Sequence, residues 1–180
     1  VLKEDEHEAY LTPEDSGRKG RLYEHCCRAI DRSLTRGPHG LPLIGTGDWN
    51  DGMDRVGEQG KGESVWLGFF LYTILREFIP ICRRYEDTER AGTYTAYQKQ
   101  LREHLNNEGW DGSWYRRAFY DDGTPLGSSE NDECKIDAIA QAWSVLSGAA
   151  TPEKAGQALE SANRHLISEE DGIIRLLTPA

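Results

Sequence analysis

The feature that most constrains the fold is VWLGFFLYTIL, residues 65–75, a segment that is apolar on nearly every face of a helix. A surface helix has one apolar stripe, so a helix of this kind must be buried on most of its sides. We expect it to run from about residue 63 to residue 85, with Pro80 kinking it or splitting off its last turn. The apolar stretch is only about 17 residues long and contains charged residues, whereas a membrane-spanning helix needs about 20 apolar residues. The sequence therefore predicts a core helix with no direct membrane contact.

Four further segments have helical spacing and complete an alternating pattern. Residues 18–36, 93–106 and 152–166 each have an apolar stripe on one side, whereas residues 136–147 are strongly apolar throughout. In chain order the helices are amphipathic, buried, amphipathic, buried and amphipathic. This order is expected when paired helices form two layers, so we predict an all-α fold, an arc of an (α/α)6 toroid with alternating inner and outer helices. A plain helical bundle has the same periodicity and stays open on pattern alone.

Two segments do not follow the helical pattern. Residues 110–129 contain WYRRAFY, which favours extended structure, and the turn signal DDGTP, so we expect a short hairpin or extended loop there. Residues 1–17 are acidic and end in LTPEDSG, which predicts an irregular N-terminal segment. Met53 is the only methionine, and the chain does not begin with one. Residues 1–180 are therefore expected to be a fragment of a single longer domain.

The composition excludes several classes of partner. The formal net charge is −10, and the Lys and Arg residues are scattered rather than gathered in a stripe. Such a chain does not attract nucleic acid phosphates, so no nucleic acid partner is expected. The four cysteines show no C-x-x-C spacing, so no metal site is predicted.

The loop GTGDWNDGMDRVGEQGKG, residues 45–62, gathers acidic residues around one tryptophan. A solvated acidic turn is one interpretation, because Asp, Asn and Gly are common loop residues. A calcium loop fits poorly, since Met53 and Gln59 stand where an EF-hand needs glycine and glutamate. A phosphate-binding loop at residues 57–64 also fits poorly, because Glu63 separates the Gly-Lys-Gly run from the serine.

A carbohydrate site is the fourth interpretation of this loop. An aromatic ring packs on the C–H face of a sugar, and carboxylates or amides bind its hydroxyl groups, so Asp48, Trp49, Asn50 and Asp51 combine both kinds of group. Cleavage of a glycosidic bond also needs a proton donor at the leaving oxygen. Asp48 or Asp51 is a candidate, since the neighbouring ring and like charge would raise its pKa.

The stretch HGLPLIGTGDWNDGMDRVGEQGKGESVWLGFFL, residues 39–71, closely resembles glycoside hydrolase family ninety-four, the inverting disaccharide and oligoglucan phosphorylases. Within that family the chain most resembles the C-terminal phosphorylase-like domain of cyclic β-1,2-glucan synthases. Four further stretches are similar to the same group: DEHEAY (5–10), LYEHCCRAID (22–31), DGSWYRRAFYDDGTPLGS (111–128) and ECKIDAIAQAWSVLSGA (133–149). The resemblance implies an (α/α)6 toroid, in agreement with the helix pattern.

The resemblance also implies roles for the D-W-N-D residues. Asp51 corresponds to the general acid and Trp49 lines the subsite of the sugar whose bond is broken, while Asp48 and Asn50 are expected to shape the loop or bind sugar. Inorganic phosphate, as co-substrate, supplies the nucleophile, so no cofactor and no second carboxylate are needed. Asp54 stands where close relatives are expected to have Asn, and we interpret it as solvated.

Three residues outside the loop are further candidates. Gln141 lies on the buried helix 136–147, where it either points into the cleft or satisfies backbone groups. Arg116 and Arg117 point to opposite faces if WYRRAFY is a strand, so at most one of them contacts sugar or phosphate, and Arg117 is our candidate.

By resemblance, the predicted function is part of a glycoside phosphorylase-like catalytic domain. It would act on β-glucan, expected to be β-1,2-linked, by inverting phosphorolysis to α-glucose 1-phosphate. The family's phosphate-contacting segment does not occur here, so the partners include the remainder of the catalytic domain and the chain alone is expected to be nearly inactive. The alternatives are an inverting β-glucosidase that uses water and a non-catalytic carbohydrate-binding domain. A cytoplasmic location is expected, with attachment of the full-length protein to the inner membrane only by resemblance.

Overall fold

The computed structural model describes residues 12, 15 and 17–179, in two units, Val1–Leu34 and Thr35–Ala180. In the described residues of the first unit the chain forms helix α1 (Leu22–Ser33), which is shorter than the predicted range 18–36. The Glu24 carboxylate accepts a hydrogen bond from the Arg21 N–H and so satisfies one donor at the start of α1. The irregular segment predicted for residues 1–17 lies almost entirely outside the described residues.

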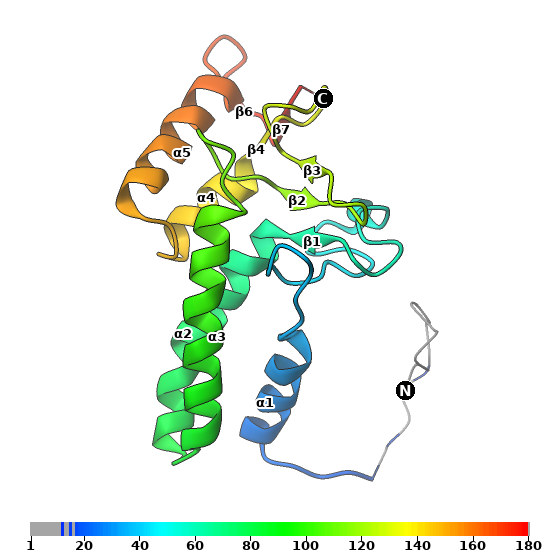
Figure 1. Ribbon diagram of the computed structural model, residues 1–180, viewed down its shortest axis with the longest axis vertical. Coiled ribbons are helices and arrows are strands. Elements are labelled where there is room, and N and C mark those ends of the chain that lie inside the picture. Colours follow the sequence, from blue (N-terminus) through cyan, green and yellow to red (C-terminus); the bar gives the residue numbers. More distant parts are fainter. Residues whose placement is uncertain (1–11, 13–14, 16, 180) are drawn as a thin grey trace. The chain divides into compact units, whose positions relative to one another are not determined.

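The second unit is built on paired helices, labelled in Figure 1. The pairs are α2 (Val65–Arg84) with α3 (Thr88–Asn107), and α4 (Ala138–Leu146) with α5 (Pro152–Leu166). A short turn at residues 85–87 reverses the chain between α2 and α3, and α4 also packs on α2. The prediction of paired helices is therefore confirmed for this unit, and the range predicted for α5 is correct.

Helix α2 is the core helix that its sequence predicts. Its buried residues include Val65, Phe69 and Leu75, and it packs along α3. The two helices approach closely at Gly68, where an added Cβ would lie 2.9 Å from Leu105 Cδ2 and 3.6 Å from Leu101 Cδ1. The length and composition of α2 alone would also allow a membrane span, and no other helix in the described part of the chain passes that test. Because eight of its residues are buried within the protein, its packing is that of a core helix.

Proline does not end α2, so the prediction that Pro80 splits off the last turn is wrong. The helix continues through Pro80 to Arg84. Inside a helix, a proline loses one backbone hydrogen bond at a cost of about 3 kcal/mol. Burial of the apolar side chains in the turns around it opposes that cost. Ile79 and Cys82, on either side of Pro80, are both buried.

Small antiparallel sheets join the ends of the helices, so the all-α prediction is corrected to mostly helical. The predicted hairpin is confirmed as β2 (Ala118–Phe119) and β3 (Pro125–Leu126). A strand not expected from the sequence, β1 (Glu63–Ser64), extends it to the order β1-β2-β3, with Ser64 opposite Ala118. Two further pairs are β4 (Ile136–Asp137) with β7 (Leu177–Thr178), and β5 (Ile167–Ser168) with β6 (Ile173–Ile174).

The loop of residues 45–62 has a small core of its own. Ile44, Met53 and Val56 are buried against Ala118 of β2, with Tyr120 and Leu126 packed around them. The apolar residues of the loop therefore attach it to the β2–β3 hairpin, and this contact positions the acidic residues that lie between them in the sequence.

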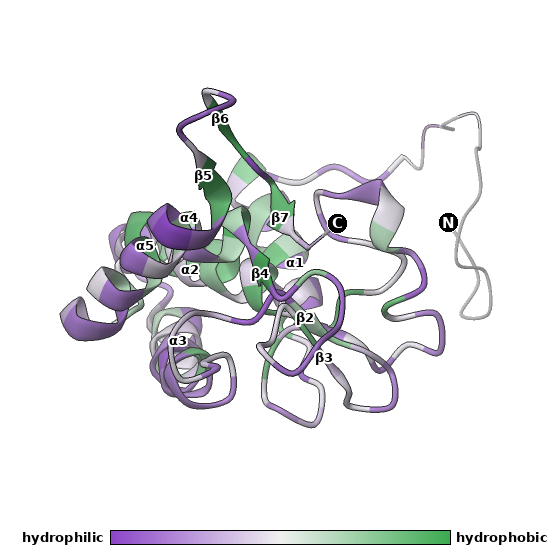
Figure 2. Ribbon diagram, turned by 90° about the horizontal axis from the view of Figure 1, so that it is seen from above, coloured by the Kyte–Doolittle hydropathy of each residue, from purple (hydrophilic) through white to green (hydrophobic). Residues whose placement is uncertain are grey.

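Figure 2 shows the hydrophilic colour on the outer turns of α3 and α5 and the hydrophobic colour on β5, β6 and β7.

Candidate active site

The first half of the loop is a short turn that starts from Asp48. The Asp48 carboxylate accepts a hydrogen bond from the Asn50 N–H at 3.1 Å, and the Asn50 side chain accepts one from the Gly52 N–H at 3.0 Å. Asn50 thereby caps a single 3-10 turn, Asp51–Met53. Met53 at the end of this turn is buried, so the turn is held from both ends.

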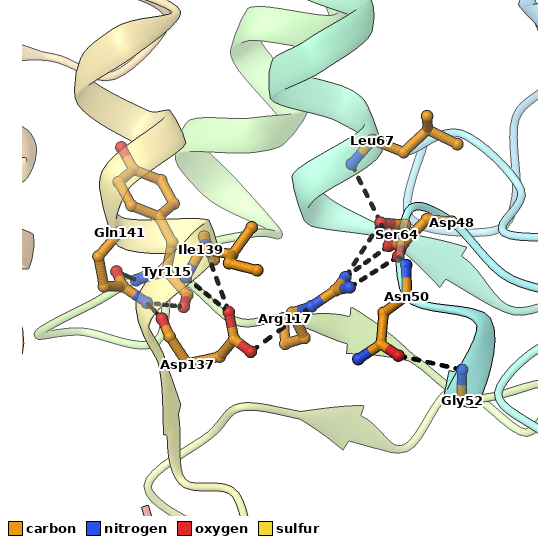
Figure 3. A network of polar contacts seen from close by, with 11 residues as sticks. Asp48, Asn50, Gly52, Ser64, Leu67, Tyr115, Arg117, Asp137, Ile139 and Gln141 are labelled. Atoms are coloured by element: carbon orange, nitrogen blue, oxygen red, sulfur yellow. Dashed lines mark hydrogen bonds and ion pairs between the residues drawn. The ribbon is translucent and has the colours of Figure 1, made fainter. Parts of the chain in front are cut away.

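Asp48 forms a buried two-point ion pair with Arg117, shown in Figure 3. Arg117 Nη1 lies 2.6 Å from Asp48 Oδ2, and Arg117 Nη2 lies 2.8 Å from Asp48 Oδ1. The Ser64 hydroxyl also donates to Asp48 Oδ2 at 2.7 Å. The exposed fraction is 0% for the Asp48 side chain and 2% for that of Arg117. Both carboxylate oxygens are therefore occupied by protein donors.

These contacts overturn the idea that Asp48 is a proton donor with a raised pKa. Burial by itself raises the pKa of Asp48, but hydrogen bonds and charge from Arg117, together with the Ser64 hydroxyl, outweigh burial. The pKa of Asp48 lies below its ordinary value of 3.8. Asp48 is thus a buried anion that anchors the loop, and its predicted sugar contact stays a prediction.

Arg117 also faces a second carboxylate, Asp137, at the start of α4. Arg117 Nε lies 3.7 Å from Asp137 Oδ2, while Asp137 Oδ1 accepts a hydrogen bond from the Ile139 N–H at 2.8 Å (Figure 3). Burial raises the pKa of Asp137, although Arg117 and the backbone N–H groups of α4 oppose this rise. One cation thus lies between two carboxylates.

Trp49 and Asp51 differ from Asp48 in their surroundings. The Trp49 side chain is 51% exposed, and Asp51 is exposed, with no hydrogen bond or ion pair from its carboxylate to any residue that the structure describes. Asp54, which we interpreted as solvated, is exposed as well, and so is Glu58. The loop therefore buries its first acid and presents the tryptophan and Asp51 to solvent.

Gln141 performs the second of the two roles considered for it. Its side chain is fully buried and accepts a hydrogen bond from the Tyr115 N–H at 2.8 Å. Its amide nitrogen donates to the carbonyl oxygens of Tyr115 at 2.7 Å and Asp137 at 2.9 Å (Figure 3). Gln141 thus satisfies backbone groups and joins α4 to the segment before β2, and its predicted sugar contact stays a prediction.

The two neighbouring arginines, which precede β2 and lie outside it, point to different surroundings. Arg116 Nη2 lies 3.0 Å from Asp111 Oδ1, and Arg116 Nη1 donates to the carbonyl of Glu108. Arg117 instead enters the buried network with Asp48. The guanidinium group of Arg117 is therefore committed to two carboxylates, and its predicted contact with sugar stays a prediction.

Two carboxylates that shape the site were not identified from the sequence. Asp121, in the turn after β2, accepts hydrogen bonds from the N–H groups of Gln59, Lys61 and Gly62 at 2.8 to 2.9 Å. Glu63 is 1% exposed and accepts from the N–H groups of His39 and Leu41. In the sequence, both residues are acids next to glycine-rich turns. Solvated acids have the same neighbours, so this pattern could not identify Asp121 and Glu63 as structural carboxylates.

A cavity of about 510 Å³ lies beside the second half of the loop. Polar and charged side chains form most of its lining: Arg55, Glu58, Gln59, Lys61, Tyr120, Asp121, Asp122 and Thr124. Neither Trp49 nor Asp51 belongs to this lining. The exposed pair therefore lies outside this cavity.

The similarity to known proteins extends over the whole chain. Residues 1–180 match the glycosyl hydrolase 94 superfamily, catalytic domain. The chain belongs to this superfamily. Within the superfamily, the cyclic beta-(1,2)-glucan synthase NdvB of Rhizobium meliloti is 48% identical over 99% of this chain. The solabiose phosphorylase of Paenibacillus borealis is 37% identical over 93% of this chain.

The glycosyl hydrolase 94 relatives are much longer than this chain. The aligned region is 6% of the glucan synthase and 22% of the solabiose phosphorylase. A third relative from Paenibacillus borealis, a 3-O-beta-D-glucopyranosyl-beta-D-glucuronide phosphorylase, is 37% identical over 80% of this chain and 19% of its own length. The chain is therefore homologous to a part of a phosphorylase catalytic domain.

Proposed function

We propose that this chain supplies the proton-donor loop of an inverting β-glucan phosphorylase, with Asp51 as the general acid and Trp49 as the platform for the sugar. The observation that carries the proposal is the division of the loop into a buried and an exposed part. Asp48 is held in an ion pair with Arg117, while Trp49 and Asp51 next to it are exposed. An exposed acid whose carboxylate has no partner in the described part of the chain remains available to a glycosidic oxygen.

The proposed reaction needs only one carboxylate from the protein. Inorganic phosphate attacks the anomeric carbon from one face, the bond from that carbon to the leaving oxygen breaks, and Asp51 gives its proton to the leaving oxygen. The products are α-glucose 1-phosphate and a glucan shortened by one unit. A hydrolase with the same stereochemistry would need a second carboxylate to activate water. The names of two relatives as phosphorylases favour phosphate as the nucleophile.

The substrate that we propose is a β-1,2-linked glucan. The support is the 48% identity to a cyclic beta-(1,2)-glucan synthase, compared with 37% to the two Paenibacillus phosphorylases. We infer also that α2 to α5 are an arc of an (α/α)6 toroid, with the remainder of the same catalytic domain as their partner. That remainder would supply the phosphate site and most of the sugar contacts.

The decisive experiment replaces the proposed acid in a protein that carries this chain within a complete catalytic domain. The assay measures release of α-glucose 1-phosphate from β-1,2-glucooligosaccharides with inorganic phosphate present. Asp51→Asn should lower kcat by about 10²-fold or more, because general acid catalysis contributes roughly 10²- to 10⁴-fold. The isolated chain should release almost no product.

Asp54→Asn is the matched control, since Asp54 is exposed in the same loop three positions later. It should leave kcat within about a factor of two, because surface substitutions away from a site have small effects. Full activity of Asp51→Asn would exclude the proton-donor role. Release of glucose without phosphate would instead support the water-using β-glucosidase.

A further inference from the structure

Arg117 lies where the first turns of two helices meet the acidic loop. Ser64, which caps α2 by accepting a hydrogen bond from the Leu67 N–H, lies 3.3 Å from Arg117 Nη1. Asp137, which caps α4, lies on the Nε side of the same guanidinium group (Figure 3). Asp48 binds both terminal nitrogens of Arg117, Nη1 and Nη2. One side chain thus connects the loop with the starts of α2 and α4.

The backbone of Arg117 is held as firmly as its side chain. Its N–H donates to the Leu126 carbonyl at 2.8 Å, and its carbonyl accepts from the Val65 N–H at 3.1 Å. Gly127 has a φ of 82°, and a Cβ atom there would lie 2.5 Å from the Arg117 nitrogen. Glycine at position 127 therefore allows the hairpin to close tightly on Arg117, and this fixes the point from which its side chain starts.

The charges of the network are suited to a fixed arginine. Two carboxylates face one guanidinium group, and the excess negative charge lies at the N-terminal ends of α2 and α4, where helix dipoles favour anions. A planar guanidinium group can bind one carboxylate at two points and still point its third nitrogen at another. A lysine ammonium group has the charge but cannot reproduce this geometry.

We propose that Arg117 is a positioning residue for the reaction, which holds Asp48 at the starts of α2 and α4 and thereby places Asp51. This inference rests on the proposed function, because the position of Asp51 affects the reaction only if Asp51 is the general acid. Asp51 is three residues from Asp48 and is exposed, so the described part of the chain supports its carboxylate only through the turn of residues 51–53, which Asp48 anchors at its start and the buried Met53 at its end. Movement of Asp48 would therefore move the proton donor.

The test compares Arg117→Lys with the native protein, in the complete catalytic domain and with a β-1,2-glucooligosaccharide and phosphate. Lysine retains the buried positive charge, so this variant is expected to fold, which the thermal unfolding midpoint checks. Its kcat should fall roughly 10- to 10²-fold, because a displacement of about 1 Å at a reacting group has an effect of that order. The KM for phosphate should stay within about a factor of three, since phosphate does not contact this loop in the proposed site.

A substrate with a different leaving group separates positioning of the acid from a general loss of structure. An aryl glucoside whose leaving group needs no proton, such as 2,4-dinitrophenyl β-glucoside, makes the general acid dispensable. With this substrate the defect of Arg117→Lys should nearly disappear, as should that of Asp51→Asn. A variant that is merely less folded would lose the same fraction of activity with both substrates, and that result would overturn the proposal.

Arg116→Lys is the matched control, because Arg116 is the neighbouring arginine and pairs with Asp111 rather than with the loop. It should leave kcat unchanged. In an Asp51→Asn background, Arg117→Lys should reduce kcat little further, since the group that it positions is already lost. Loss of activity in Asp51→Asn with full activity in Arg117→Lys would refute the positioning role alone. Full activity of Asp51→Asn would refute the proposed function itself.

Discussion

Asp48 and Arg117 are 69 positions apart in the sequence and are joined in the structure by nitrogen–oxygen distances of 2.6 and 2.8 Å. This ion pair fastens an acidic, glycine-rich loop to the β2–β3 hairpin. Because the pair is buried, removal of one partner leaves the other charge without compensation. The five predictions that follow test this network and the hydrogen bonds around it.

Asp48→Asn should loosen the first half of the loop. The amide cannot bind the guanidinium group as an anion does, so Arg117 is left beside Asp137 alone. The free energy of local opening should fall by about 3 kcal/mol, as is typical when one member of a buried ion pair is removed. Hydrogen exchange at the Asn50 amide, which donates to Asp48, measures this change. Unchanged exchange there, with Asp54→Asn as the control, would contradict the anchoring role.

The acid limb of the stability curve should depend on Asp48. The folded-state pKa of Asp48 is lowered, so its contribution is fully present above the ordinary value of 3.8 and is lost as the pH falls through the folded-state pKa. Urea unfolding between about pH 5 and pH 2 should therefore show a steeper loss for the native chain than for Asp48→Asn. Parallel slopes for the two proteins would show that Asp48 is not ion-paired in solution.

The contribution of Asp137 to stability should change with pH in the opposite direction to that of Asp48. Burial raises its folded-state pKa, so its contribution to stability is present below 3.8 and is lost as the pH rises through the folded-state value. Asp137→Asn keeps a side chain that can cap α4 and removes this titration. The variant should lose less stability than the native chain between about pH 4 and pH 7, measured by urea unfolding. A larger loss in the variant would mean that the ion pair with Arg117 dominates.

Asp121 should hold the second half of the loop. Asp121→Ala removes the acceptor for three backbone N–H groups, those of Gln59, Lys61 and Gly62. The same hydrogen bonds lower the pKa of Asp121 against the effect of burial. Exchange of these three amides should accelerate at least tenfold, since each loses a charge-assisted hydrogen bond. Asp122→Ala is the control, because Asp122 accepts a hydrogen bond from the nearby Thr124 N–H rather than from these three amides, and it should leave them unchanged.

Gln141→Leu should weaken the contact between α4 and the segment before β2. Leucine fills a similar volume but leaves the N–H and carbonyl of Tyr115 without partners, which costs about 2 kcal/mol or more for buried groups. The Tyr115 amide should then exchange faster by about tenfold or more. Gln157→Leu on the exposed side of α5 is the control. Equal effects of the two substitutions would show that burial of Gln141 is unimportant.

Local patterns predicted the helices better than the strands. The range of α5 is correct because Thr151 caps it and Pro152 follows, which is a strong start signal. The start of α3 was predicted at residue 93, directly after Gly92, which is five residues too late. The helix begins at Thr88, because Asp87 caps it, and it continues through Gly92. Residues 136–137 were predicted as helix but form β4, because they pair with residues 177–178, about forty positions away.

The sequence by itself determined the core helix α2, the hairpin, and the D-W-N-D loop on which the resemblance to the superfamily rests. These features depend on residue type and on spacing over a few positions, which a single sequence records. The predicted burial of the helix at residues 136–147 is wrong in part, because Val145 and Leu146 of α4 are exposed. Only the tertiary structure decided which acid of the loop is buried. Asp48 and Asp51 are chemically identical, and they differ because the fold brings Arg117 and Ser64 to one of them and leaves the other exposed. The state of a carboxylate depends on such partners, and their positions are set by the packing of distant segments.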